Sequence, residues 1–233
     1  DESYPVSISE DGEVIEITAE NKPITVKISK RDIYGNELKG AKMQIIDSEG
    51  NIVDEWTSDG TDHIVTELPA GDYTLKEIAA PDGYVIATDI SFTVDVYGNV
   101  TVENVDAVAV SEDGNPLIVM VDDTTKVRIS KQDITNGKEL PGAKLEIRDA
   151  DGSLVEGWTS GKVPHTVRGL ELEKAYTLTE TRAPDGYAEA ESIVFKLVQD
   201  GSEQSNMVYV KSDGDWVKLD DATLIMQDAP VLD

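Results

Sequence analysis

The sequence predicts an all-β protein made of two tandem antiparallel β-sandwich domains. One observation is an internal repeat about 100 residues long, a length typical of a whole domain. Another is the local pattern, in which short segments rich in Val, Ile, Thr and Tyr alternate with polar residues between Asp-Gly turns. An apolar stripe with the helical period of about 3.6 residues is absent. We therefore expect about seven or eight short strands in each unit.

The duplication is visible in motifs that occur twice in the same order. The copies are VKISKRD at 26–32 and VRISKQD at 127–133, ELKGAK at 37–42 and ELPGAK at 139–144, WTS at 56–58 and 158–160, YTLKE at 73–77 and YTLTE at 176–180, and APDGY at 80–84 and 183–187. We assign the first domain to residues 24–123 and the second to residues 124–233. The junction at residues 122–126 has no Gly or Ser run, which predicts a stiff connection.

Residues 1–23 are too short for another repeat, and the chain reads as a piece of a longer protein. Asn21 precedes Asp122 by the same offset that separates the two VKIS-type motifs. The segment at 15–21 is therefore either the last strand of a preceding repeat or an ordinary N-terminal strand, and the sequence leaves both open. We expect Asn21 to stay unmodified, because the lysine of its own unit is absent.

The composition excludes several functional classes. The chain has 20 basic and 47 acidic residues, a formal net charge of -27, which argues against binding to nucleic acid or to an anionic membrane surface. It has no cysteine, so disulfides, thiol catalysis and thiolate metal sites are excluded. Two histidines leave little room for a histidine-based metal site. We expect no metal, no cofactor and no membrane span in these residues.

Strand periodicity places ionisable side chains on apolar faces. Residues at i, i+2 and i+4 of a strand share one face, so the lysine at the end of the first strand follows two apolar residues on the same face. The same rule applies to a glutamate in the YTLxE motif and to an aspartate that ends the last strand. The candidate site residues are Lys30, Glu77 and Asp122 in the first unit and Lys131, Glu180 and Asp228 in the second.

Three ionisable groups in an apolar core are costly unless they are paired or neutral. Burial lowers the pKa of an amine and raises that of a carboxylic acid, which favours a neutral amine beside a protonated acid. Such a pair can condense to an amide with loss of water, while the glutamate moves the proton. A buried ion-paired triad without a covalent bond is the alternative, and periodicity does not separate the two.

These motifs resemble the B-type repeats of Gram-positive collagen adhesins and the related SpaA-type pilin domains, over nearly the whole chain. The first unit is particularly similar to the streptococcal adhesin domain from which the SpyCatcher and SpyTag pair was engineered. The resemblance implies an Ig-like, prealbumin-type sandwich with an internal isopeptide bond. It makes Lys30 and Lys131 the amine partners, Glu77 and Glu180 the promoters, and Asp122 and Asp228 the acceptors. Most members have Asn as the acceptor, and the segment 225–229 matches less closely than its counterpart in the first unit.

Other polar residues are interpreted as structural. The acidic pairs at 149–152 and 213–215 lack the spacing of a calcium loop and predict hairpin turns. His63 and His165 occupy matching positions without further ligand residues nearby, and Trp56 and Trp158 are expected to pack on the sandwich.

The function expected from the sequence is that of a structural stalk in a Gram-positive, wall-anchored adhesin or pilin on the cell surface. Its partners would be the neighbouring repeats of the same protein or a host matrix protein, and we expect a monomer. The alternative is an adhesive module that recognises a host matrix protein or a glycan. An exposed aromatic patch would favour that alternative, and the low aromatic content of 6% favours the stalk. We expect no turnover of an external substrate.

Overall fold

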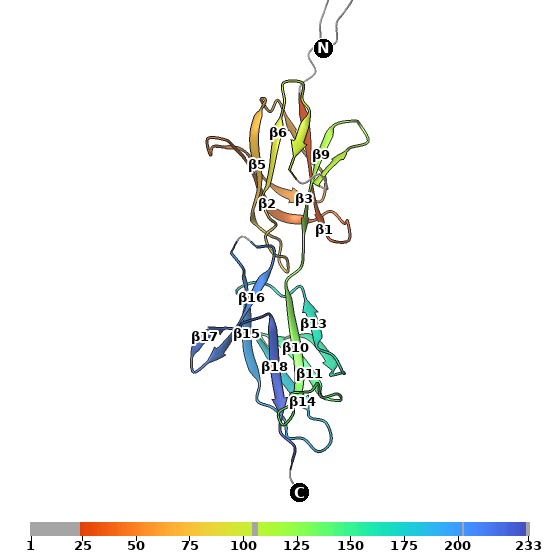
Figure 1. Ribbon diagram of the computed structural model, residues 1–233, viewed down its shortest axis with the longest axis vertical. Coiled ribbons are helices and arrows are strands. Elements are labelled where there is room, and N and C mark those ends of the chain that lie inside the picture. Colours follow the sequence, from red (N-terminus) through yellow and green to blue (C-terminus); the bar gives the residue numbers. More distant parts are fainter. Residues whose placement is uncertain (1–23, 104–106, 202, 232–233) are drawn as a thin grey trace, which may run out of the picture.

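The computed structural model describes residues 24–103, 107–201 and 203–231, and these form two β-sandwiches placed end to end (Figure 1). All regular elements in these residues are strands, which confirms the all-β, two-sandwich prediction. The described residues contain no helix that is long and apolar enough to span a membrane. The possible strand at 15–21 and Asn21 lie outside the described residues.

The described residues of the first domain form nine strands in two sheets, slightly more than expected. The strands are β1 (Thr25–Asp32), β2 (Lys39–Asp47), β3 (Ile52–Asp59), β4 (His63–Thr66), β5 (Gly71–Ala79), β6 (Ile90–Val94), β7 (Val100–Val102), β8 (Val108–Val110) and β9 (Pro116–Asp122). One sheet has the order β4-β1-β9-β8 and the other the order β3-β2-β5-β6-β7.

The described residues of the second domain also form nine strands in two sheets, but these sheets have three and six strands instead of four and five. They are β10 (Lys126–Asp133), β11 (Lys144–Asp149), β12 (Leu154–Thr159), β13 (His165–Arg168), β14 (Tyr176–Arg182), β15 (Ile193–Gln199), β16 (Asn206–Ser212), β17 (Asp215–Lys218) and β18 (Thr223–Asp228). Its sheets have the orders β13-β10-β18 and β12-β11-β14-β15-β16-β17. The acidic pairs at 149–152 and 213–215 are the turns of the hairpins β11–β12 and β16–β17, as expected.

The first and last strands of each domain pair in parallel, which the sequence analysis did not predict. Strand β1 pairs with β9, with Lys30 opposite Met120, and β10 pairs with β18, with Lys131 opposite Met226. All other strand pairs are antiparallel. Two parallel neighbours cannot be joined by a short turn, so the whole domain lies between them in sequence. This pairing brings the two ends of each unit side by side.

Each sandwich encloses its own apolar core. In the first domain the core includes Ile28, Leu75 and Ile118, and the equivalent residues Ile129, Leu178 and Leu224 fill the second. Trp56 and Trp158 behave as expected: each is half-buried, packs against its core and stacks on the nearby histidine. The ring centroids of Trp56 and His63 are 3.9 Å apart.

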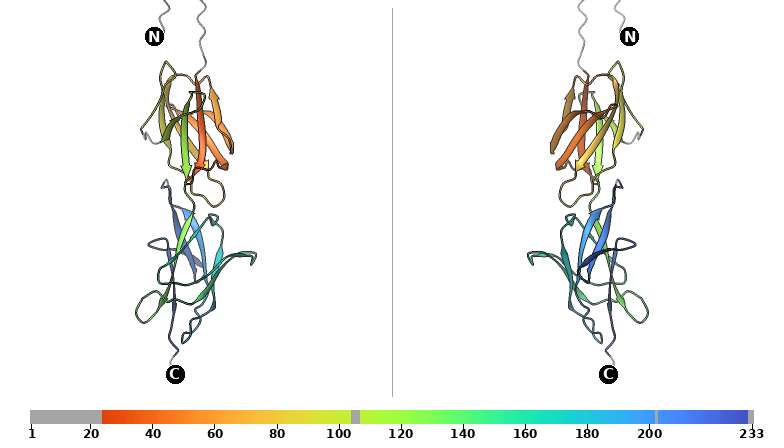
Figure 2. Two further views of the ribbon diagram at one scale, coloured as in Figure 1. Left: turned by 90° about the vertical axis from the view of Figure 1, so that its right-hand side faces the viewer. Right: turned by 90° about the vertical axis from the view of Figure 1, so that its left-hand side faces the viewer.

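The connection between the domains is short and hydrogen-bonded (Figure 2). The Thr125 amide donates to the Gly83 carbonyl oxygen at 3.0 Å, and the Thr125 hydroxyl donates to the Leu170 carbonyl oxygen at 2.6 Å. Gly83 also lies so close to Gly169 that an added Cβ would be 2.7 Å from its carbonyl oxygen. Strand β9 therefore leads almost directly into β10, with backbone contacts on both sides of the junction.

Candidate functional site

The structure brings Lys30, Glu77 and Asp122 together inside the first sandwich. Lys30 comes from β1, Glu77 from β5 in the opposite sheet and Asp122 from the end of β9, and they are 3%, 1% and 0% exposed. Each follows two core residues on its own face of the strand, which is the periodicity that the sequence predicted. The site thus lies between the two sheets, where the parallel pair β1–β9 faces β5.

The lysine amine is the centre of the site in the first domain. Lys30 Nζ contacts Asp122 Oδ1 and lies 3.3 Å from Glu77 Oε2. The amide of Ala87 donates to the same Glu77 oxygen at 2.7 Å, which fixes the carboxyl group toward the amine. The second oxygens of Glu77 and Asp122 are buried without a hydrogen-bond partner in the described residues. Such unpaired buried oxygens make the charged form of the triad costly.

The second domain repeats this geometry. Lys131 Nζ contacts Asp228 Oδ1 and lies 3.2 Å from Glu180 Oε1, and the Ala190 amide donates to Glu180 Oε2 at 2.8 Å. All three ionisable side chains are buried. Two copies with divergent surrounding sequences have therefore kept the same three groups in contact.

Electrostatics favour a protonated acceptor acid in both domains. Burial raises the pKa of Asp122 to about 7, although the adjacent Lys30 amine works in the opposite direction. The nearby Glu77 carboxyl group adds to the increase in the pKa of Asp122, because two carboxylates repel each other. Burial also raises the pKa of Asp228, again against the effect of its lysine. Asp122 is therefore partly neutral near pH 7, and the direction of both shifts is the one expected for buried acids.

The sequence analysis missed the backbone amides that position the glutamates. Ala87 and Ala190 each lie ten residues after the glutamate that they hold. The equal spacing, just beyond the APDGY motif in both units, is a signal that could have found them. The roles of Lys30, Lys131, Glu77, Glu180, Asp122 and Asp228 in bond formation stay predictions.

Neither the histidines nor the acidic turns form a metal site in the described residues. These residues contain no group of three or more His, Asp or Glu side chains that could hold a metal ion. Instead, His63 Nε2 lies 2.8 Å from Asp54 Oδ2, and His165 Nε2 lies 2.6 Å from Glu156 Oε1. Each histidine ring also stacks on the nearby tryptophan. These pairs belong to the surface of the sandwich and not to the triad.

The chain is similar to several solved structures. One is the Bacillus anthracis TIE protein, with 24% identity, a TM-score of 0.46, and coverage of 90% of this chain and 34% of that one. It is also similar to a C-terminal fragment of the pilus adhesin SpaC from Lactobacillus rhamnosus GG, with 20% identity, a TM-score of 0.49, and coverage of 91% and 98%. The shaft pilin SpaA from the same organism has 14% identity, a TM-score of 0.35, and coverage of 90% and 99%.

The chain thus spans about a third of the length of the TIE protein. No curated protein matches it in sequence. The family model of the SpaA prealbumin-like fold domain matches twice, at residues 24–107 and 125–211, and so covers most of the chain and both triad lysines. The chain therefore belongs to the family of SpaA prealbumin-like fold domains.

Proposed function

We propose that this chain is a stalk segment of a surface adhesin or pilin, and that one intramolecular Lys–Asp isopeptide bond cross-links each of its two domains. The observation that carries the proposal is the buried contact of a lysine amine with an aspartic acid beside a glutamate, present in both domains. Family membership and the end-to-end arrangement of the domains support the stalk role. The net charge of -27 suits a protein displayed in water outside the cell.

The proposed reaction is a condensation within the folded domain. The neutral Lys30 amine attacks Cγ of protonated Asp122, and a bond forms between Nζ and Cγ. The amine loses one proton, which Glu77 takes and passes to the hydroxyl oxygen of Asp122. That oxygen already carries the proton of the acid, so it leaves as water when its bond to Cγ breaks. The amide nitrogen keeps the second hydrogen of the amine and Glu77 returns to its starting state, so amine plus acid gives amide plus water.

Glu77 acts as the proton carrier in this proposal. Its Oε2 is 3.3 Å from the lysine nitrogen, close enough to take a proton as the amine attacks and to return one to the leaving oxygen. The apolar core favours the product, because one neutral amide replaces two groups that are costly to bury as ions. The chain acts on itself in a single turnover, without an external substrate.

Intact mass under denaturing conditions tests the proposal. With both bonds formed, the protein is lighter than its sequence mass by about 36 Da, the mass of two waters. Glu77→Ala should restore about 18 Da, because the first bond no longer forms, while Glu55→Ala on the exposed surface should restore none. A parent protein with the full sequence mass would leave only an ion-paired triad and overturn the proposal.

A recognition module remains the second candidate, but the structure offers it little support. The strongly exposed aromatic side chains among the described residues are Tyr34 and Tyr97. Tyr34 lies in the turn between β1 and β2, and Tyr97 lies in the turn between β6 and β7. These turns are at opposite ends of the first sandwich, so the two rings do not form one patch. We therefore favour the stalk.

A further inference from the structure

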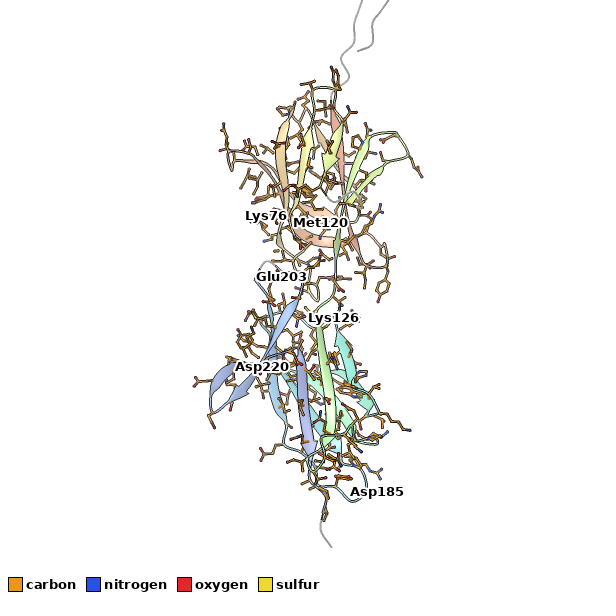
Figure 3. All side chains as sticks on the ribbon, viewed as in Figure 1. Lys76, Met120, Lys126, Asp185, Glu203 and Asp220 are labelled. Carbon is orange, nitrogen blue, oxygen red and sulfur yellow. The ribbon has the colours of Figure 1, made fainter. Side chains whose placement is uncertain are left out.

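Two glutamines of the second domain contact the first domain beside its triad. Gln199, the last residue of β15, accepts a hydrogen bond from the Ile86 amide through Oε1 at 2.9 Å. Gln204, in the turn between β15 and β16, donates to the Val121 carbonyl oxygen through Nε2 at 2.7 Å. Figure 3 shows this turn at the junction, with Glu203 just below Lys76 and Met120 of the first domain.

One contact adjoins the acceptor residue itself, and the other adjoins the residue that holds the glutamate. Ile86 precedes Ala87, whose amide holds Glu77 Oε2 at 2.7 Å, and Val121 precedes the acceptor Asp122. The space between the turn and the first domain is a groove of about 600 Å³, and Glu77 and Ala87 contribute to its lining. The second domain therefore holds the backbone on which two members of the first triad depend.

Gln199 is itself held in place. Its Nε2 donates to the Glu203 carbonyl oxygen at 2.7 Å, within the same turn. The amide group is thus fixed at one end by the second domain and presents its oxygen to the Ile86 amide. A side chain with a fixed orientation positions its partner better than a freely rotating one, because less rotamer entropy is lost in the contact.

The second triad provides an internal comparison. Its glutamate is held by Ala190, and the residue equivalent to Ile86 is Glu189. Among the described residues, no side chain is hydrogen-bonded to the backbone of Glu189 or to the carbonyl oxygen of Gln227. The two triads therefore share their chemistry but differ in this external support.

We propose that Gln199 is a positioning residue for the first domain, and that the folded second domain thereby accelerates formation of the bond between Lys30 and Asp122. This inference rests on the proposed function, since it concerns the rate of the same condensation. Loss of the Gln199 contact lets the segment at 86–87 move, so the Ala87 amide holds Glu77 for less of the time. Small displacements of a catalytic carboxyl group reduce rates steeply.

The test compares a pair of variants at one position in the full chain. Gln199→Met keeps the length of the side chain without a hydrogen bond, whereas Gln199→Glu keeps an oxygen that can accept from the Ile86 amide. The chain is made in a short pulse of cell-free translation, samples are quenched in denaturant over time, and the cross-linked peptides of both domains are quantified by mass spectrometry. The second-domain bond gives an internal reference in every sample.

We expect Gln199→Met to slow the first-domain bond by roughly three- to tenfold, the effect of losing one hydrogen bond at the transition state. The second-domain bond should keep its rate. Gln199→Glu should restore part of the first-domain rate, because it keeps the acceptor oxygen but loses the Nε2 donor that contacts the Glu203 carbonyl oxygen. Arg148→Ala is the control, because the contacts that it removes, with Glu146 and the Gly152 carbonyl oxygen, lie within the second domain and leave Ile86 untouched. It should not change either rate.

The outcomes separate this inference from the proposed function. If both bonds form in Gln199→Met at the parent rates, Gln199 has no positioning role and the function stands. If Gln199→Met and Gln199→Glu slow the reaction equally, the acceptor oxygen at position 199 makes no difference to the rate and the inference is wrong. If the parent protein forms no bond in either domain, the proposed function itself fails.

Discussion

The two domains contain the same triad in different surroundings. Asp122 lies at the junction, where the second domain packs against the end of the first, and burial raises its pKa to about 7. Asp228 lies at the end of the second domain away from the junction, and burial raises its pKa in the same direction. Gly83 and Gly186 occupy equivalent turns of the two domains, with φ angles of 83° and 86°, but their surroundings differ. Gly83 meets the backbone of Gly169, whereas Gly186 has no atom within 4 Å of an added Cβ.

Some properties of the triad therefore belong to the repeat, and others arise from the contact between the two domains. Contacts within the triad are nearly equal, with lysine-to-glutamate distances of 3.3 and 3.2 Å, so the repeat alone specifies the chemistry. The environment of the triad depends on the neighbouring domain. Variants made in pairs, one in each domain, can therefore separate the two contributions.

The largest effect is expected from removing the lysines. By the chain-entropy model for covalent cross-links, closing a loop of 92 residues between Lys30 and Asp122 contributes about 4–5 kcal/mol to the free energy of unfolding. Lys30→Ala should lower the melting temperature of the first domain by about 10 °C or more and make that domain sensitive to trypsin. Lys131→Ala should do the same to the second domain alone. Calorimetry and limited proteolysis measure both.

The variant Glu77→Gln separates the stability contributed by the covalent bond from that contributed by the lysine side chain itself. It keeps both Lys30 and Asp122 but removes the proton carrier, so most of the loss in melting temperature should remain. A Lys30→Ala protein that melts and digests like the parent would show that the first domain gains no stability from a cross-link.

The next effect distinguishes the two glycine turns. Any residue with a Cβ at Gly83 or Gly186 adopts a left-handed conformation at a cost of about 1–2 kcal/mol. Gly83→Ala also places its Cβ 2.7 Å from the Gly169 carbonyl oxygen, so the junction has to shift. We expect Gly83→Ala to destabilise its domain more than Gly186→Ala, and to broaden the distribution of interdomain distances measured by spin labels on both domains. Equal effects in both assays would mean that the junction tolerates a shift freely.

Much of the site was predictable because strand periodicity is local. Once Val26 and Ile28 are assigned to the core, Lys30 has to point inward, and the same holds for Glu77 after Tyr73 and Leu75. The repeat strengthened each assignment by supplying a second copy. Fold class and triad members could therefore be derived from residues close together in the chain.

The rest depended on contacts between distant residues. The parallel pairing of β1 with β9 joins residues 92 apart, and no local pattern specifies its direction. The Gln199 contact with Ile86 spans 113 residues and has no equivalent in the other unit, so duplication gave no signal for it. Tertiary contacts that occur only once in the chain leave no repeat to compare.

The pH dependence of bond formation allows the acceptors Asp122 and Asp228 to be compared. The reaction needs protonated Asp122, which predominates below its pKa of about 7. Above that pH the protonated fraction falls about tenfold per unit, so the first-domain rate should fall with it. We expect the second-domain rate to fall with rising pH as well, because burial raises the pKa of Asp228 in the same direction. Diluting a short translation pulse into buffers between about pH 5 and about pH 9 and quantifying both bonds tests this.

The control for that experiment is Asp122→Asn, whose acceptor does not titrate. Its first-domain rate should lose the decline above about pH 7. If the decline persists in Asp122→Asn, another group causes it.

The smallest effect is expected at two serines that belong to the repeat itself. Ser58 Oγ accepts a hydrogen bond from the Ala41 amide at 3.0 Å, and Ser160 Oγ accepts one from the Ala143 amide at 2.9 Å. Substitution by Ala leaves each buried amide without that acceptor, at a cost of about 1–2 kcal/mol in unfolding free energy. Ser160 also donates to the Leu140 carbonyl oxygen, so Ser160→Ala should cost slightly more than Ser58→Ala. Urea unfolding in a background with both Lys30 and Lys131 replaced by Ala measures these values without the cross-links.

Adding Gly83→Ala provides the control for the two serine variants. Because neither serine contacts the other domain, the cost of each serine substitution in unfolding free energy should not change. A change would show that the junction influences the whole sandwich and not only the end that carries the first triad.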